Sequence, residues 1–174
     1  LKEVEKDLER LNIISERFNK IGSKPKLSEE NICEEIDKTI SYLRARLSNK
    51  ISLEFEHPKD EIIVYLNNQL FSWSLENIIK NSIDSIKDSG KVKISIIEEN
   101  EYLKIYISDN GIGIKQSLKN KIFNPGVTTK ERGWGLGLSL SKRIIEEYHK
   151  GEIKLIESIV GQGTKMLIKL KAVK

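Results

Sequence analysis

The chain has 174 residues, of which 38% are hydrophobic and 32% charged, a balance typical of one globular domain of ordinary size. Its 30 basic and 26 acidic residues give a formal net charge of +4, but the signs are interspersed, which argues against a nucleic-acid-binding protein. No apolar run reaches the roughly 18 residues of a membrane span, and the single cysteine and two histidines exclude an internal disulfide and argue against a zinc site.

The first segment, residues 1–21, has the apolar spacing of an amphipathic helix, which Gly22 and Pro25 end. Its apolar residues recur at steps of three and four: Leu1, Val4, Leu8, Leu11, Ile14, Phe18 and Ile21. Such a stripe needs a partner, either its own domain or the other half of a helical hairpin. Its length and terminal position favour the hairpin. Because the chain starts at Leu1 rather than Met, we expect it to be part of a longer protein.

A second helix is predicted over residues 29–47, with Ser28 as its N-cap. Alternating apolar residues then predict two short strands, residues 51–55 and 61–65, with a turn at His57 between them. Neither histidine of the chain belongs to a nucleophile–base arrangement, so both are predicted to be structural or exposed.

A third helix is predicted to start at Asn67 or Asn68 and to end near Lys87. It carries Asn77 and Asn81, which are four residues apart and therefore share one face, beside an apolar stripe. Amides beside an apolar stripe are costly unless they find partners. Two hypotheses stay open: the amides are exposed or bond to neighbouring backbone, or their carbonyl oxygens hold a hard cation such as Mg²⁺ together with phosphate oxygens.

Two alternating runs, residues 92–96 and 103–107, predict an antiparallel hairpin. The second run leads into the sequence Asp-Asn-Gly-Ile-Gly at residues 109–113, which places a carboxylate beside backbone that can approach a ligand closely. The acids and the glutamate of a calcium loop are missing. Taken alone, the motif is better explained as a tight Asx-type turn.

The stretch from residue 121 to residue 138 contains five glycine or proline residues, so it cannot be regular structure throughout. It runs into a helix predicted over residues 138–148. A loop that ends in glycines at a helix N-terminus suits phosphate, because the first N–H groups lack internal partners and the helix dipole favours negative charge. The alternative is an ordinary exposed loop with a glycine-rich helix entry.

The glycine spacing excludes the common nucleotide-binding motifs. Gly-Trp-Gly-Leu-Gly at residues 133–137 differs from the dinucleotide fingerprint, and the chain has neither a P-loop nor the signatures of eukaryotic protein kinases. A nucleotide site must therefore belong to another architecture. A last hairpin is predicted from residues 152–157 and 164–170, with Gly161 and Gly163 in its loop.

Five motifs in order resemble those of bacterial sensor histidine kinases. They are Leu75–Asp84, similar to the N box; Asp109–Gly113, similar to the first glycine box; Ile122–Gly126 with Thr128–Lys130, similar to the F box; Gly133–Leu138, similar to the second glycine box; and Gly161–Thr164, similar to the closing Gly-x-Gly-Thr turn. Each motif is weak alone, but the five with family-like spacing are specific and cover about residues 70–170. The wider group includes the gyrase, Hsp90 and MutL ATPases.

The resemblance implies an α+β fold, a two-layer α/β sandwich of the Bergerat type with three helices on a mixed sheet. ATP would bind between the helices and a flexible lid. Residues 23–174 would form this ATP-binding domain, and residues 1–22 would be a remnant of the second helix of the dimerisation hairpin. Residues 116–134, which include the lid, would be mobile or remodelled without nucleotide.

The resemblance also implies roles for single residues. Asn81 would ligate Mg²⁺ with assistance from Asn77. Glu76 would be a base or polariser for the accepting imidazole, with a surface salt bridge as the plainer alternative. Asp109 would accept a hydrogen bond from the adenine amino group, with Thr164 near it through water.

Glycines and cations of the other motifs would complete the site. Gly111 and Gly113 would let backbone approach the base, and Lys130 and Arg132 would reach the phosphates from the lid. The second glycine box would open the helix that receives the phosphates; its residues are Gly133, Gly135, Leu136, Gly137 and Leu138.

The chain departs from the family pattern at two places. Asp84 stands where the family often has a phosphate-binding lysine, which puts that contact in doubt. No acceptor histidine is present in residues 1–21, which resemble the second helix of the hairpin rather than the first.

The function implied is that of the ATP-binding catalytic part of a histidine kinase, which moves the γ-phosphoryl group of ATP to a histidine and then to a response regulator. The expected partners are ATP, the acceptor helix of the parent protein and a receiver domain, with a homodimeric parent, in the cytoplasm or anchored in the inner membrane by other segments. One rival is a gyrase- or Hsp90-like ATPase clamp, which would need a glutamate where Asn77 stands. The other is a regulatory module that keeps the fold without transferring phosphate.

Overall fold

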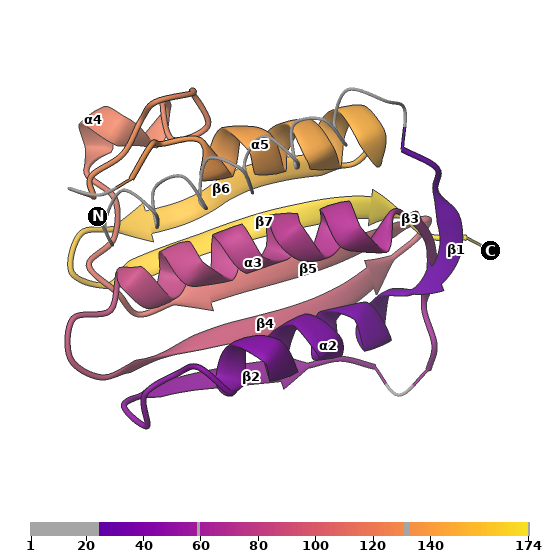
Figure 1. The fold of residues 1–174 in the computed structure, drawn as a ribbon, viewed down its shortest axis with the longest axis horizontal. Coiled ribbons are helices and arrows are strands. Elements are labelled where there is room, and N and C mark those ends of the chain that lie inside the picture. Colours follow the sequence, from indigo (N-terminus) through magenta and orange to yellow (C-terminus); the bar gives the residue numbers. More distant parts are fainter. Residues whose placement is uncertain (1–24, 59, 131–132, 174) are drawn as a thin grey trace, which may run out of the picture.

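The computed structural model describes residues 25–58, 60–130 and 133–173. The helix predicted over residues 1–21 and the predicted phosphate ligand Arg132 lie outside this part of the chain. In the described part, helices pack on a five-stranded sheet in two layers (Figure 1). The predicted α+β two-layer sandwich is therefore confirmed.

The sheet is mixed, with the strand order β2-β4-β5-β7-β6. The strands are β2 (Ile51–Glu56), β4 (Gly90–Glu99), β5 (Tyr102–Asp109), β6 (Glu152–Ile159) and β7 (Gly163–Lys171). The pair β2 and β4 is parallel, and every other neighbouring pair is antiparallel. Both predicted hairpins, β4–β5 and β6–β7, are thus confirmed.

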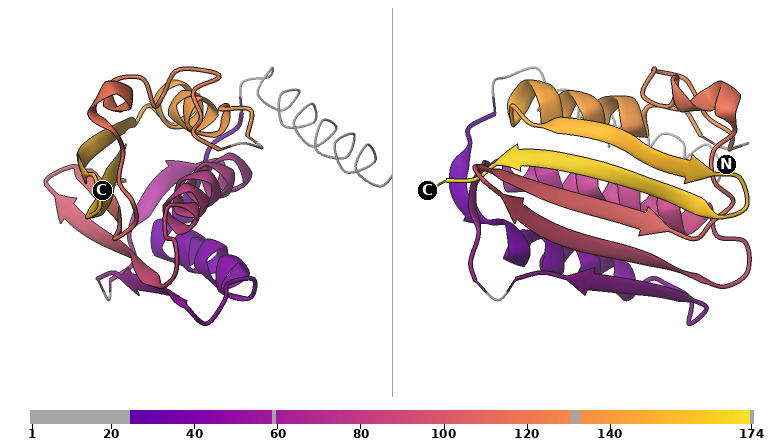
Figure 2. Two further views of the ribbon diagram at one scale, coloured as in Figure 1. Left: turned by 90° about the vertical axis from the view of Figure 1, so that its left-hand side faces the viewer. Right: turned by 180° about the vertical axis from the view of Figure 1, so that it is seen from behind.

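Three helices cover one face of this sheet (Figure 1). They are α2 (Ile32–Arg44), α3 (Asn68–Asp84) and α5 (Gly137–Arg143), the last continued by a π-helical turn, η1 (Ile144–Tyr148). The short helix α4 (Gln116–Lys119) follows β5. Seen from behind, the sheet has no described helix in front of it (Figure 2). None of the helices in the described ranges is long and apolar enough to cross a membrane.

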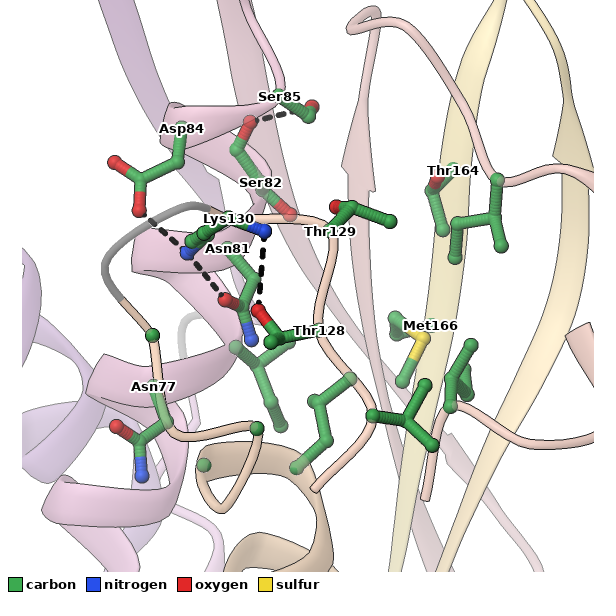
Figure 3. Close-up of a pocket in the computed structure, with 18 of the residues that line it drawn as sticks. Asn77, Asn81, Ser82, Asp84, Ser85, Thr128, Thr129, Lys130, Thr164 and Met166 are labelled. Atoms are coloured by element: carbon green, nitrogen blue, oxygen red, sulfur yellow. Dashed lines mark hydrogen bonds and ion pairs between the residues drawn. The ribbon is translucent and has the colours of Figure 1, made fainter. Parts of the chain in front are cut away.

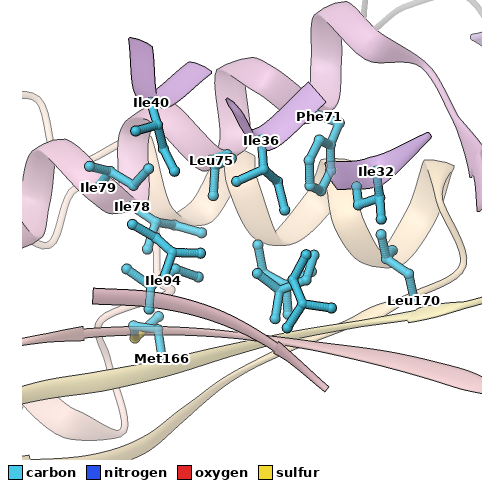
Figure 4. Packing of buried hydrophobic residues seen from close by; sticks show 14 of the residues in the cluster. Ile32, Ile36, Ile40, Phe71, Leu75, Ile78, Ile79, Ile94, Met166 and Leu170 are labelled. Carbon is cyan, nitrogen blue, oxygen red and sulfur yellow. The ribbon is translucent and has the colours of Figure 1, made fainter. Parts of the chain in front are cut away.

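The core lies between the helices and the sheet (Figure 4). Isoleucines at steps of four on α2 and the stripe of α3 point toward alternate residues of the strands, as the helical and strand periods require. Fully or almost fully buried members are Ile32, Ile36, Ile40, Phe71, Leu75, Ile78, Ile79, Ile94 and Ile105. A smaller cluster of Leu70, Trp73, Leu140 and Ile144 joins α3 to α5. This packing fixes α3 and α5 side by side, and the site lies beside them.

The start of the second helix differs from the prediction. Ser28 lies in a short strand, β1 (Ser28–Asn31), which pairs with β3 (Ile63–Leu66) in a separate two-stranded sheet. The N-cap of α2 is Asn31, whose side chain accepts a hydrogen bond from the backbone N–H of Cys33 at 3.1 Å. The prediction of Ser28 was wrong because Asn31 is an equally good cap and the pairing with β3 takes Ser28 into a strand.

His149 is structural, as predicted. Its Nδ1 donates to the carbonyl of Ile144 at 2.9 Å, and its Nε2 accepts from the N–H of Asn67 at 3.1 Å. Burial lowers the pKa of its imidazole, because the charged form would lose its hydration. The neutral ring therefore ties the end of η1 to the start of α3.

Candidate nucleotide site

A cavity of about 640 Å³ opens where the C-terminal half of α3 faces the end of β5, the start of β7 and the start of α5. This volume is in the range of small-molecule sites. Residues of α3, including Asn77 and Asn81, line one side, and Thr164 and Met166 of β7 line the other (Figure 3). The segment from Val127 to Leu138, as far as it is described, completes the lining. Four of the five sequence motifs meet here together with the residue that closes the fifth, Thr164.

One end of the cavity is built around Asp109, the last residue of β5. Its Oδ1 accepts three hydrogen bonds: from the hydroxyl of Ser85 at 3.2 Å, from the N–H of Gly111 at 2.9 Å and from the N–H of Thr164 at 3.2 Å. Within the described residues, Oδ2 accepts none. One oxygen thus fixes the carboxylate and the other is left to accept a hydrogen bond from a ligand.

The glycines of this end serve backbone packing. A Cβ at Gly111 would lie 1.8 Å from Oγ of Ser85, and a Cβ at Gly113, whose φ is +68°, would lie 2.2 Å from the carbonyl oxygen of Ile159. Gly113 lines the cavity and Gly111 does not. The close approach that the sequence predicted at Gly111 is therefore to the end of α3, and the structure brings only Gly113 to the cavity wall.

Ser158 joins the two loops behind Asp109. Its hydroxyl donates to the carbonyl of Gly163 at 3.1 Å, accepts from the N–H of Ile114 at 2.8 Å and lies 3.0 Å from Oγ1 of Thr164. The residue is 2% exposed. It therefore holds Thr164 and the loop after Asp109 in one fixed arrangement.

At the other end, Asn77 and Asn81 both line the cavity from α3, as their spacing predicted (Figure 3). The Nδ2 of Asn77 is buried and has no hydrogen-bond partner among the described residues. The Oδ1 of Asn81 accepts from the ammonium of Lys130 at 2.8 Å. The buried NH₂ group of Asn77 lacks a hydrogen-bond acceptor, which a ligand could supply. The ammonium of Lys130 at Asn81 shows that this position stabilises positive charge.

Lys130 extends from the loop toward α3. Its Nζ donates to Asn81 and also to Oδ2 of Asp84 at 2.6 Å, and its backbone N–H donates to Oγ1 of Thr128 at 3.1 Å. Both Lys130 and Asp84 are substantially exposed. The predicted phosphate ligand is thus at the cavity but is bonded to α3.

A backbone hydrogen bond closes the base of this loop. The N–H of Gly126 donates to the carbonyl of Gly135 at 3.0 Å. Gly135 has a φ of +65°, and a Cβ there would lie 2.4 Å from the carbonyl carbon of Gly126, so only glycine fits. At Gly137, the first residue of α5, an added Cβ would meet only Asn77, at 3.7 Å. Gly135 is therefore needed for the loop, whereas Gly137 faces the cavity.

A sequence profile described as histidine kinase-, DNA gyrase B- and HSP90-like ATPase matches residues 69–174, which contain the whole cavity. The chain belongs to this ATPase family.

Two curated relatives align with most of the chain. The chain is 32% identical over 156 residues to nitrogen regulation protein NtrY of Azorhizobium caulinodans, and 34% identical over 164 residues to sporulation kinase E of Bacillus subtilis. These alignments cover 86% and 91% of the chain but 20% and 22% of the relatives. The chain thus spans about a fifth of the length of the curated relatives it matches.

The solved catalytic domain of histidine kinase ThkA has the same fold, with a TM-score of 0.76 and 28% identity. The match covers 84% of this chain and 96% of that domain. ThkA has also been solved in complex with the response regulator protein TrrA, at 24% identity, a TM-score of 0.78 and a coverage of 98% of this chain and 49% of ThkA. The predicted resemblance to the histidine kinase catalytic domain is confirmed.

Most residues that the sequence predicted for a nucleotide site line this cavity. They are Asn77, Asn81, Asp109, Gly113, Lys130, Gly133, Gly135, Leu136, Gly137, Leu138 and Thr164. Glu76 does not line it; its Oε1 lies 2.5 Å from Nζ of Lys80 in an ion pair one helical turn apart. The structure therefore favours the plainer interpretation of Glu76 as a salt-bridging residue.

Sequence reasoning missed Ser85 and Ser158, which hold Asp109 and Thr164. Ser85 follows the third helix four residues after Asn81, but a serine at a helix end is ordinary and gave no signal. Ser158 pairs directly with Thr164 in the register of β6 and β7, one pair from the end of the hairpin. The strand predicted from the sequence ended at residue 157, so Ser158 was expected in the loop and not opposite Thr164.

Proposed function

We propose that this chain is the ATP-binding catalytic part of a sensor histidine kinase, transferring the γ-phosphoryl group of ATP to a histidine in two-component signalling. The observation that carries the proposal is the meeting of the Asn77–Asn81 face, the carboxylate of Asp109 and the lysine of the loop in one cavity. The family match and the similarity to sporulation kinase E and to the catalytic domain of histidine kinase ThkA support it. The acceptor histidine helix and the receiver domain of a response regulator are the proposed macromolecular partners.

The base of the nucleotide would lie at Asp109. Its Oδ2 is free of hydrogen bonds within the described residues, so it can accept from the exocyclic amino group of adenine, while the three donors on Oδ1 prevent the carboxylate from turning away. Apolar lining residues such as Ile78 and Met166 would contact the ring faces. This arrangement selects a base that donates at that position.

The phosphates would lie between α3, the loop and the start of α5. Asn77 has an unpaired Nδ2 that can donate to a phosphate oxygen, and α5 begins beside it at Gly137, where the first-turn N–H groups of a helix favour an anion. Lys130, and by resemblance Arg132, would contact phosphate from the loop. The side chains would act by positioning and charge neutralisation, since phosphoryl transfer needs little covalent chemistry from the protein.

The residues present fit a divalent cation. Amide oxygens are ligands for Mg²⁺, and the ammonium that bonds to Oδ1 of Asn81 marks a point where a cation is stabilised. Asn81, with Asn77, would hold the ion. A bound Mg²⁺ would supply charge neutralisation at the phosphates.

Calorimetry with ADP and Mg²⁺ tests the binding part of this proposal. The variant Asn81→Ala should weaken binding by about tenfold or more, and the matched control Asn49→Ala, in an exposed turn, should not change it. Nucleotide affinity that is unchanged in Asn81→Ala would contradict the site.

Transfer is tested by adding γ-labelled ATP and a separate acceptor-helix domain with its histidine. Label on that histidine supports the kinase. Steady hydrolysis of ATP by the chain alone, without transfer, would favour the ATPase clamp, and binding without either reaction would favour the regulatory module.

A further inference from the structure

The last turn of α3 presents two oxygen atoms to one cation. Asn81 and Asp84 are three residues apart and therefore share a face of the helix. Their atoms Oδ1 and Oδ2 lie 2.8 and 2.6 Å from the same Nζ of Lys130 (Figure 3). The lysine comes from a loop 46 residues further along the chain, so the convergence is tertiary.

The charge at this end of α3 requires a cation from outside the helix. Asp84 is the last residue of α3, where the helix dipole is negative, and the last turn of α3 contains no basic residue. Lys80, one turn earlier, is paired with Glu76. A carboxylate at a helix C-terminus is unfavourable by itself, so Asp84 is explained by the cation that it binds.

We propose that Asn81 and Asp84 together form a cation seat, which Lys130 fills in the absence of nucleotide and a divalent metal ion fills when nucleotide binds. The inference rests on the proposed function and adds Asp84 as a metal ligand. Mg²⁺ in nucleotide sites is usually held by one or two carboxylates together with phosphate oxygens. Asn77 and Asn81 supply no carboxylate, and Asp84 supplies it.

The seat couples metal binding to the loop. A divalent ion and an ammonium group repel each other and cannot occupy the same point, so metal entry displaces Lys130. The displaced ammonium is then available to the phosphates, whose negative charge replaces Asp84 as its partner. By linkage, anything that holds Lys130 on the seat weakens metal binding, and metal binding releases the loop.

The contribution of the metal at this cation seat can be measured without an activity assay. It is the ratio of the ADP dissociation constant in EDTA to that in excess Mg²⁺. The variant Asp84→Asn should lower this ratio by about tenfold, because the neutral amide is a poorer ligand. Asp88→Asn, which removes the same charge from an exposed residue just beyond the helix, should leave the ratio unchanged.

Asn81→Ala separates this inference from the function on which it rests. If Asn81→Ala brings the ratio to one while Asp84→Asn leaves it at the wild-type value, the seat is wrong and the nucleotide site stands. If neither variant changes the ratio, the metal site of the proposed function also fails. Thermal unfolding of each variant checks that α3 is intact.

Lys130→Met removes the competing ammonium and tests the exchange. The Mg²⁺ concentration that gives half of the metal-dependent gain in ADP affinity should fall about threefold, as expected for loss of one exposed ion pair. In the Asp84→Asn background the same substitution should have no such effect. An unchanged Mg²⁺ midpoint in Lys130→Met would overturn the exchange.

Discussion

The two ends of the cavity are held in different ways. At the end where we propose that the base binds, here called the base end, Oδ1 of Asp109 accepts hydrogen bonds from the end of α3, from the loop after β5 and from β7. Ser158 joins the loops behind it. At the other end, where we propose that the phosphates bind and which we call the phosphate end, the loop contacts α3 through the side chain of Lys130. Lys130 and Asp84 are both about half exposed there. The base end is preorganised for one ligand group, whereas the contacts at the phosphate end can be exchanged. Affinity should therefore depend mostly on the first end, and the response to metal and nucleotide on the second.

The largest test of this contrast is Asp109→Asn. The amide oxygen can still accept the three internal hydrogen bonds, but its NH₂ group would face the amino group of adenine, donor against donor. ADP affinity should fall about 100-fold, the effect of losing a hydrogen bond to a charged group and leaving a polar pair unsatisfied. Calorimetry measures the affinity, and circular dichroism should show a folded protein. Binding at the wild-type level would mean that the base does not lie at Asp109.

Gly111→Ala tests the rigidity of the base end. The added Cβ would lie 1.8 Å from Oγ and 2.8 Å from the carbonyl carbon of Ser85, so the loop or the end of α3 must move. The free energy of unfolding should fall by about 2 kcal/mol, as for other overpacked sites.

The matched control is Gly137→Ala, at the phosphate end. Its Cβ would meet only Asn77 at an ordinary contact distance, so the fold should keep its stability and only nucleotide binding should change. Chemical denaturation compares the two variants. Equal loss of stability in both would remove the distinction between the two ends.

The smallest expected effect is that of Ser158→Ala. The change leaves the N–H of Ile114 without its acceptor and frees the hydroxyl of Thr164, which should cost about 1 kcal/mol of stability. ADP binding should also weaken, because the backbone N–H of Thr164 donates to the carboxylate of Asp109. Ser89→Ala, in an exposed turn, is the control for denaturant unfolding. Loss of stability with unchanged binding would show that Ser158 supports the fold alone.

The sequence predicted those features that follow from local periodicity. Asn77 and Asn81 share a face because a helix repeats every 3.6 residues, and both hairpins follow from alternating strands. It could not predict which partner a residue meets across the chain. The contact of Lys130 with Asp84 depends on how the loop folds back. The pairing of Ser158 with Thr164 depends on β6 continuing beyond residue 157, where the predicted strand ended.

The N-cap of α2 shows a further limit. Ser28 and Asn31 are both good caps three residues apart, and only the pairing of β1 with β3 decides between them. Likewise, sequence alone left Glu76 between a chemical role and an ion pair. In this structure Glu76 forms an ion pair with Lys80, one helical turn away.

The hydrogen bond between Gly126 and Gly135 brings the two ends of the loop together independently of what lies between them. Loop-closure entropy grows only with the logarithm of loop length, so added residues between these glycines would cost little free energy, about 0.6 kcal/mol per doubling. The length of the segment between Gly126 and Gly135 is thus only weakly constrained by the stability of the fold. Insertions or deletions between these glycines should therefore leave the sheet and α3 unchanged.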